Sequence, residues 1–205
     1  MDAAAPALTK KGNATRKTLL DSTIELIAST GYAATTTQAV LDHSGISRGS
    51  LLHQFKTREH LMVAAALEAV ERMFAGTKEG LAGVADPIQA LREYPNVLWQ
   101  VQNDVPARAF AELQLASRWE QGLQQALRPA VKEVNKRIST EIHDIAEANG
   151  LASVDKLVIE VGALISAMQG LAVGSSLTTD DKITHEILLA LKTHYIDRLE
   201  ASIVR

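Results

Sequence analysis

Apolar residues recur at three- and four-residue spacing along most of the chain, which is the period of amphipathic α-helices. The first such segment extends from about Thr15 to Thr30, and Gly31 follows it as a residue that tolerates a left-handed helix end. Hydroxyl caps, glycines and prolines divide the remaining sequence into further helices. We expect these at about 37–44, 48–55, 62–77 (continuing a helix that starts near Arg58), 87–101, 106–117, 119–149, 154–177 and 180–202, with Pro129 kinking or interrupting the longest. The pattern predicts an all-α fold of about nine helices.

Two of these helices are short and joined by a tight turn. Thr35 and Thr36 offer hydroxyl caps to the first of them, Gly45 lies in the turn, and Ser47 caps the second. The second helix has a free side opposite its two apolar residues at four-residue spacing, Leu51 and Phe55. This arrangement is typical of a helix-turn-helix, whose second helix enters the major groove of DNA.

The stretch from Gly31 to Leu61, GYAATTTQAVLDHSGISRGSLLHQFKTREHL, resembles the DNA-binding domain of the tetracycline-repressor (TetR) family of bacterial regulators. The resemblance covers about residues 15–65 and rests on the Gly-aromatic pair, the Thr-Thr cap, Gly-Ile-Ser and Gly-Ser-Leu at the family's spacing. It implies a flexible arm (1–14), a three-helix helix-turn-helix DNA-binding domain (15–61), and a helical effector-binding and dimerisation domain (62–205). The chain departs from the family at Leu52, Gln54 and Arg58, where Tyr, His and Lys are usual.

Side chains around the turn suit contacts with DNA. Gln38 and Arg48 occupy positions at which family members contact bases, and they match the edges of adenine and guanine. Gly49 allows close approach of the backbone, and Leu52 suits a thymine methyl group. Contacts to phosphate are expected from hydroxyl, imidazole, amide and guanidinium groups, namely those of Thr37, Ser47, Ser50, His53, Gln54 and Arg58.

Charge is distributed unevenly along the chain, whose formal net charge is −3. Residues 1–60 contain seven basic and five acidic side chains, whereas the remainder contains 14 basic and 19 acidic ones. A mildly basic end on an acidic body favours phosphate contact at that end only.

The last two predicted helices carry a pattern that favours dimerisation. Small residues repeat every four positions in the first, and apolar residues do so in the second, from Ile183 onwards. Glycine costs a helix roughly 1 kcal/mol relative to alanine, so a close backbone contact is expected to compensate. The resemblance implies a homodimer through a four-helix bundle, with Gly162, Ser166, Gly170, Gly174, Ile187, Leu191 and Tyr195 at the interface. Residues 157–177 are also long enough to span a bilayer, although Glu160 and Gln169 argue against that alternative.

An effector site is expected among the central helices, because aromatic and apolar residues there are accompanied by a few polar groups. The candidates for lining a small-molecule pocket are Trp99, Phe110, Leu113, Gln114, Trp119, Met168 and Gln169. Ordinary core packing is the competing interpretation for each of them. A small, moderately hydrophobic effector is favoured.

Enzymes, cofactors and metal sites receive no support from the sequence. The chain has no cysteine, no glycine-rich phosphate loop, and no closely spaced pair among its histidines (His43, His53, His60, His143, His185, His194). Residues 1–15 lack the apolar core of a signal peptide, which favours the cytoplasm. The sequence thus predicts a repressor that an effector releases from a palindromic operator on double-stranded DNA. The alternative is a helical carrier or antirepressor that binds a ligand but no operator, and a salt-sensitive DNA shift would separate the two.

Overall fold

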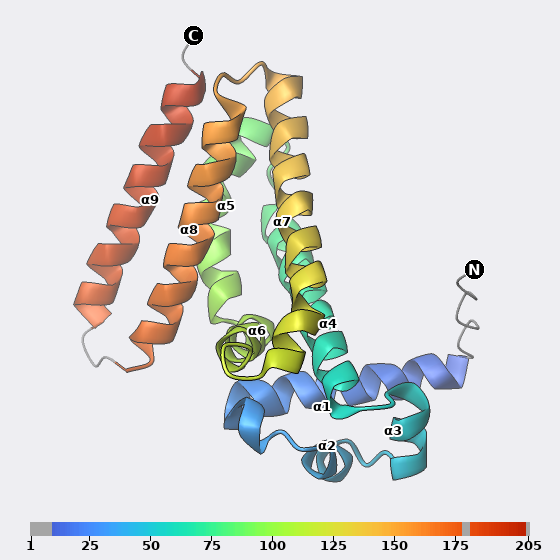
Figure 1. Ribbon diagram of the computed structural model, residues 1–205. Helices are drawn as coiled ribbons and strands as arrows, with labels where there is room; N and C mark the ends of the chain where they lie inside the picture. The colour runs from blue at the N-terminus through green and yellow to red at the C-terminus, as the bar shows by residue number, and fades with distance from the viewer. Residues whose placement is uncertain (1–9, 178–180, 204–205) are drawn as a thin grey trace.

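The computed structural model describes residues 10–177 and 181–203, and nine α-helices account for most of this part of the chain, which contains no β-strand (Figure 1). The all-α prediction is confirmed, and most helix ends lie within a few residues of the expected positions. The helices are α1 (Lys10–Ala34), α2 (Thr37–Ser44), α3 (Arg48–Gln54), α4 (Arg58–Leu81), α5 (Pro87–Asn103), α6 (Val105–Ala116), α7 (Gln121–Asn149), α8 (Val154–Ser175) and α9 (Asp181–Ile203).

The first helix is longer than the sequence predicted. It begins at Lys10, so residues 10–14 are helical and are not part of an arm, while residues 1–9 lie outside the described residues. Gly31 interrupts the helix with φ +82° and ψ 166°, a conformation that glycine adopts without steric cost. The expected end at Gly31 is therefore a break, after which a short segment continues to Ala34.

The longest helix, α7, continues through Pro129, which was expected to kink or interrupt it. Leu123 and Leu127 are buried before the proline, and Ile142 and Ala146 are buried after it. Packing on both sides holds the helix together where the proline removes one backbone hydrogen bond.

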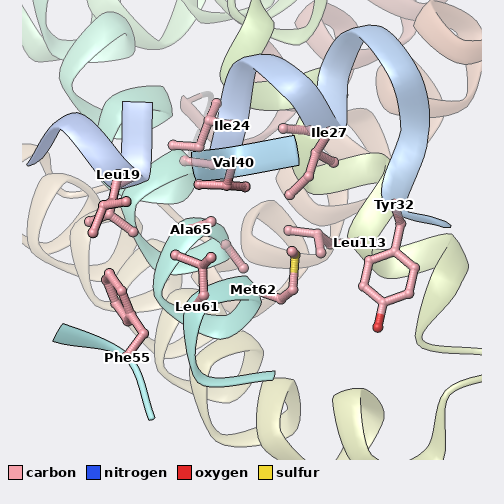
Figure 2. Packing of buried hydrophobic residues seen from close by; sticks show 14 of the residues in the cluster. Leu19, Ile24, Ile27, Tyr32, Val40, Phe55, Leu61, Met62, Ala65 and Leu113 are labelled. Atoms are coloured by element: carbon pink, nitrogen blue, oxygen red, sulfur yellow. The ribbon is translucent and has the colours of Figure 1, made fainter. Parts of the chain in front are cut away.

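One hydrophobic core joins the N-terminal helices to the body of the molecule (Figure 2). Leu19, Ile24 and Ile27 of α1 and Val40 of α2 all belong to this core. Burying a side chain of this size stabilises the fold by roughly 1.5–3 kcal/mol. Helices α3, α4, α6 and α7 contribute the remaining large members, which include Leu51, Leu61, Met62, Leu113, Leu123 and Leu127.

This core crosses the expected boundary between residues 61 and 62. That boundary lies inside the continuous helix α4, and three leucines of the first core come from α6 and α7. Figure 1 shows α6 lying directly over α1, between the N-terminal helices and the rest of the molecule. The N-terminal helices and α6 therefore share one packed unit.

A second core lies between α5, α7, α8 and α9. Met168 of α8 and Leu199 of α9 are fully buried there, and Leu98 of α5 packs with them. Arg92 of α5 is also paired with Glu200 of α9 at 2.7 Å, on the outside of this core. The four helices form the end of the molecule opposite α2 and α3 (Figure 1).

Helix α8 is the only described helix whose length and apolar composition would allow it to cross a membrane, and 22% of the relevant window is buried within the monomer. One such helix is weak evidence for a span, because a helix covered by other protein has the same composition.

Candidate nucleic-acid interface

The turn between α2 and α3 has the caps that the sequence predicted. The Thr36 hydroxyl accepts a hydrogen bond from the Ala39 amide at 3.1 Å, and Ser47 accepts one from the Ser50 amide at 3.3 Å. Gly45 closes α2 in the left-handed conformation (φ 66°), where a residue with a Cβ would be strained. These local interactions fix the start of α3 relative to α2.

Helix α3 has one buried side and one exposed side. Leu51 is 2% exposed and packs in the first core, and Phe55 caps the helix and is buried with it. Leu52 is 51% exposed, which is unusual for a large apolar side chain. We call the exposed side of this helix the recognition face, and it consists of Arg48, Gly49, Ser50, Leu52 and His53.

Three predicted contact residues near this face are hydrogen-bonded within the protein. The amide of Gln38, which is exposed on α2, donates to Asp42 Oδ1 at 2.7 Å. The hydroxyls of Ser47 and Ser50 share a hydrogen bond of 2.9 Å. All of these groups are exposed. Each could therefore break its internal hydrogen bond to contact DNA without leaving a buried polar group unpaired. Thr37, the first residue of α2, is half-buried.

Gln54 and Arg58, which the sequence predicts as phosphate contacts, are hydrogen-bonded to backbone carbonyls of the protein. The Gln54 amide donates to the Gly12 carbonyl of α1 at 3.2 Å. Arg58 donates from Nη2 to the Tyr32 carbonyl at 2.6 Å and from Nε to the Thr35 carbonyl at 3.1 Å. Its guanidinium also lies 4.1 Å from the centroid of the Tyr32 ring. Sequence spacing could not reveal these contacts, because the partners lie 23 to 42 positions away.

Ion pairs connect α1 to α4. Arg72 of α4 donates to both Asp21 of α1 and Glu68 of its own helix. Although partial burial acts to raise the pKa of the Asp21 carboxyl, hydrogen bonds from Lys17 and Arg72 bring this pKa below its usual value. The sequence offered no signal for the pairing of Asp21 with Arg72, since 51 residues separate them.

The apolar members of the predicted effector site are divided between the two cores. Trp99 and Met168 belong to the second core, whereas Phe110 and Leu113 belong to the first. Gln169 of α8 donates a hydrogen bond to Gln114 of α6, so these two do meet. Trp119 lies in the turn before α7 and is 82% exposed, whereas a residue that lines a pocket is expected to be largely covered.

Hollows occur elsewhere on the monomer. A hollow of about 520 Å³ lies along the surface of α9, beside Leu189 and His194. A second hollow, of about 240 Å³, lies between the start of α8 and the end of α9. Neither contains a predicted effector residue. Among the described residues, no group of three or more His, Asp or Glu side chains could hold a metal ion.

The second core contains a buried hydroxyl that the sequence analysis did not recognise. Tyr195 is 1% exposed, and its phenolic oxygen has no hydrogen-bond partner among the described residues. Burial raises its pKa above the usual value, as it does for Tyr94. Tyr195 is therefore a core residue, which corrects its prediction as part of the dimer interface.

The other predicted interface residues are exposed to different extents. Gly162, Ser166, Gly170 and Gly174 all lie on the exposed side of α8, and Ile187 is 43% exposed. Leu191 is half-buried against the second core. Large apolar side chains that the sequence analysis did not assign to this surface extend it. We define the α8–α9 face as these four small residues with Ile159, Val173, Leu177, Ile183, Ile187 and Leu189.

Comparison with known proteins identifies the N-terminal helices. Residues 19–65 match the model of the family described as bacterial regulatory proteins, tetR family. This match covers the helix-turn-helix region and not the helices that follow it. HTH-type transcriptional regulator Rv2912c of Mycobacterium tuberculosis is 27% identical over 130 residues, which are 63% of this chain and 65% of that relative. HTH-type transcriptional repressor KstR of the same organism is 33% identical over 76 residues, which cover 37% of this chain and 34% of KstR.

Solved structures share the fold over nearly the whole chain. A TetR transcriptional regulator from Chloroflexus aurantiacus has a TM-score of 0.72 at 18% identity, with 91% of this chain and 96% of that chain covered. A putative transcriptional regulator from Saccharomonospora viridis, solved in complex with choline, has a TM-score of 0.63 at 17% identity, with 92% and 96% covered. The prediction of a helix-turn-helix domain followed by a helical domain is thus confirmed as a fold.

Proposed function

We propose that this protein is a sequence-specific, DNA-binding transcriptional repressor of the cytoplasm, released from a palindromic operator by a small, moderately hydrophobic effector. The observation that carries the proposal is the recognition face. It is exposed on a helix whose start is fixed by Ser47 and whose opposite side is anchored by Leu51. A rigidly held helix with a polar and basic exposed side suits entry into the major groove.

Operator binding requires a second copy of the chain, which we propose covers the α8–α9 face. Six of the ten large apolar side chains that are exposed in the described residues belong to this face. A two-fold contact there pairs α8 and α9 with their copies as a four-helix bundle. The dimer then presents two recognition faces to half-sites about 34 Å apart, one helical turn of DNA.

Within each half-site, Arg48 and Gln38 are proposed to read bases, whereas Thr37, Ser47, Ser50 and His53 contact phosphate. Arg48→Ala is expected to weaken operator binding by about 1–3 kcal/mol per half-site, because a bidentate contact to guanine is lost. Base preference should relax at one position of each half-site. Selection from a randomised palindrome by wild-type and variant protein measures both effects.

Arg128→Ala is the matched control, because Arg128 is an exposed arginine on α7, away from the recognition face. It should retain wild-type affinity and preference. If Arg48→Ala kept the full base preference of the wild-type protein, Arg48 would not be a base-reading residue. A wild-type protein without salt-sensitive DNA binding would instead favour the carrier or antirepressor.

For the effector, the contact between Gln114 and Gln169 supports a site near the junction of α6 and α8. Two amides in a half-buried setting offer hydrogen bonds to a ligand that is otherwise apolar. Native mass spectrometry of the purified protein would reveal a copurified ligand. Titration of that ligand with and without operator should then give different affinities, since coupling between two sites is reciprocal. Equal affinities would contradict release by the effector.

A further inference from the structure

The first two turns of α1 form a basic segment outside the matched family domain. Residues 10–18 contain four basic side chains and no acidic one, and the family match starts only at residue 19. The basic members are Lys10, Lys11, Arg16 and Lys17. A run of this kind on the protein surface attracts polyanions.

Two contacts fix this segment against the C-terminal end of α3. Gln54, the last residue of α3, donates its amide hydrogen to the Gly12 carbonyl at 3.2 Å. The guanidinium of Arg16 lies 4.6 Å from the centroid of the Phe55 ring, which caps α3. The start of α1 is therefore held in place beside the proposed recognition helix, and Figure 1 shows the two elements side by side.

The four basic side chains differ in whether they already have a contact within the protein. Arg16 is half-buried against Phe55, and Lys17 is paired with Asp21 at 2.8 Å. Lys10 and Lys11 are both exposed, and neither has an ion-pair partner among the described residues. These two lysines are the members of the segment that are available to a ligand.

We propose that Lys10 and Lys11 bind the phosphate backbone at the edge of the major groove that α3 enters, which extends the DNA contact beyond the helix-turn-helix. This inference rests on the proposed function. A helix of seven residues is about 10 Å long, and the major groove is about 12 Å wide. A segment attached to the end of so short a helix therefore lies within about one groove width, roughly 12 Å, of the phosphates that line the groove. These contacts add affinity without reading sequence.

The test compares Lys10→Gln/Lys11→Gln with Lys132→Gln/Lys136→Gln, a matched pair of exposed lysines on α7. Glutamine removes the charge and has a helix propensity close to that of lysine. Operator affinity is measured over a series of salt concentrations. The slope of log affinity against log salt should fall by about 0.9 for each lost contact, or about 1.8 per protomer. We expect the loss of affinity to be largest at low salt, with unchanged base preference, and no change in the control pair.

Lysine acetylation of the wild-type protein with and without operator gives an independent measurement. Operator should protect Lys10 and Lys11 from acetic anhydride, while Lys132 and Lys136 stay reactive. An unchanged salt slope in the variant, or equal reactivity with and without DNA, overturns this inference while operator binding itself stands. A wild-type protein that binds no DNA overturns the proposed function as well.

Discussion

Replacing Gly170 by Leu is expected to dissociate the proposed dimer at concentrations where the wild-type protein remains associated. No atom lies within 4 Å of a Cβ placed at Gly170, so the monomer accommodates a larger side chain. At a close helix contact, in contrast, overpacking costs about 1–3 kcal/mol per site, and a two-fold interface contains the site twice. The dissociation constant should then rise by a factor of about 30 to 20,000. Sedimentation velocity over a dilution series measures this change.

Gly122→Leu is the matched control for that experiment. Gly122 lies in an exposed position of α7, and a Cβ there also meets no atom within 4 Å. Both variants replace glycine in a helix and should gain similar helix propensity. Dimerisation of Gly170→Leu as tight as that of Gly122→Leu would place the interface on another surface.

Replacing Arg58 by Ala is expected to lower the free energy of unfolding by about 2–4 kcal/mol, even in the absence of DNA. The substitution removes hydrogen bonds from a charged donor to the carbonyls of Tyr32 and Thr35, together with the contact to the Tyr32 ring. A hydrogen bond to a charged group contributes about 1.5–3 kcal/mol, and a cation–π contact adds about 0.5–1 kcal/mol. The expected loss counts the two hydrogen bonds as one, because a single half-buried guanidinium makes both of them. Urea unfolding at a fixed protein concentration measures the loss.

Arg58→Lys separates a structural role from a phosphate contact. Lysine keeps the charge but lacks the planar donors that serve two carbonyls at once, so it should recover only a small part of the stability. Lys56→Ala, at an exposed neighbouring position, should leave the unfolding curve unchanged. Two results together would show that Arg58 contacts phosphate and has no structural role: an unchanged unfolding midpoint in Arg58→Ala, and a salt slope of DNA binding that is lower by about one.

Features that depend on neighbouring residues were predictable from the sequence. Thr36, Gly45 and Ser47 cap helices through contacts within three or four positions, so residue type and spacing were sufficient to place α2 and α3. The recognition face followed from the same pattern, because Leu51 and Phe55 identify the buried side of α3.

Features that depend on distant parts of the chain were not predictable. The inward contacts of Gln54 and Arg58 use partners on α1 and just before α2. The four-residue apolar spacing in α9 also misled the interface prediction. Four residues turn a helix by roughly 40° more than a full turn, so Ile183 and Tyr195 differ by roughly 120°. Ile183 is accordingly 53% exposed, whereas Tyr195 is buried.

The shared core beneath α1 limits how the N-terminal helices of this protein can be exchanged for those of another. Leu113, Leu123 and Leu127 pack with Leu19 and its neighbours in that core, although they come from α6 and α7. A chimera joined after residue 61 would replace these leucines with side chains selected to fit another domain. A functional hybrid must therefore transfer α6 and the first turns of α7 together with the DNA-binding helices, so the exchangeable module is discontinuous in sequence.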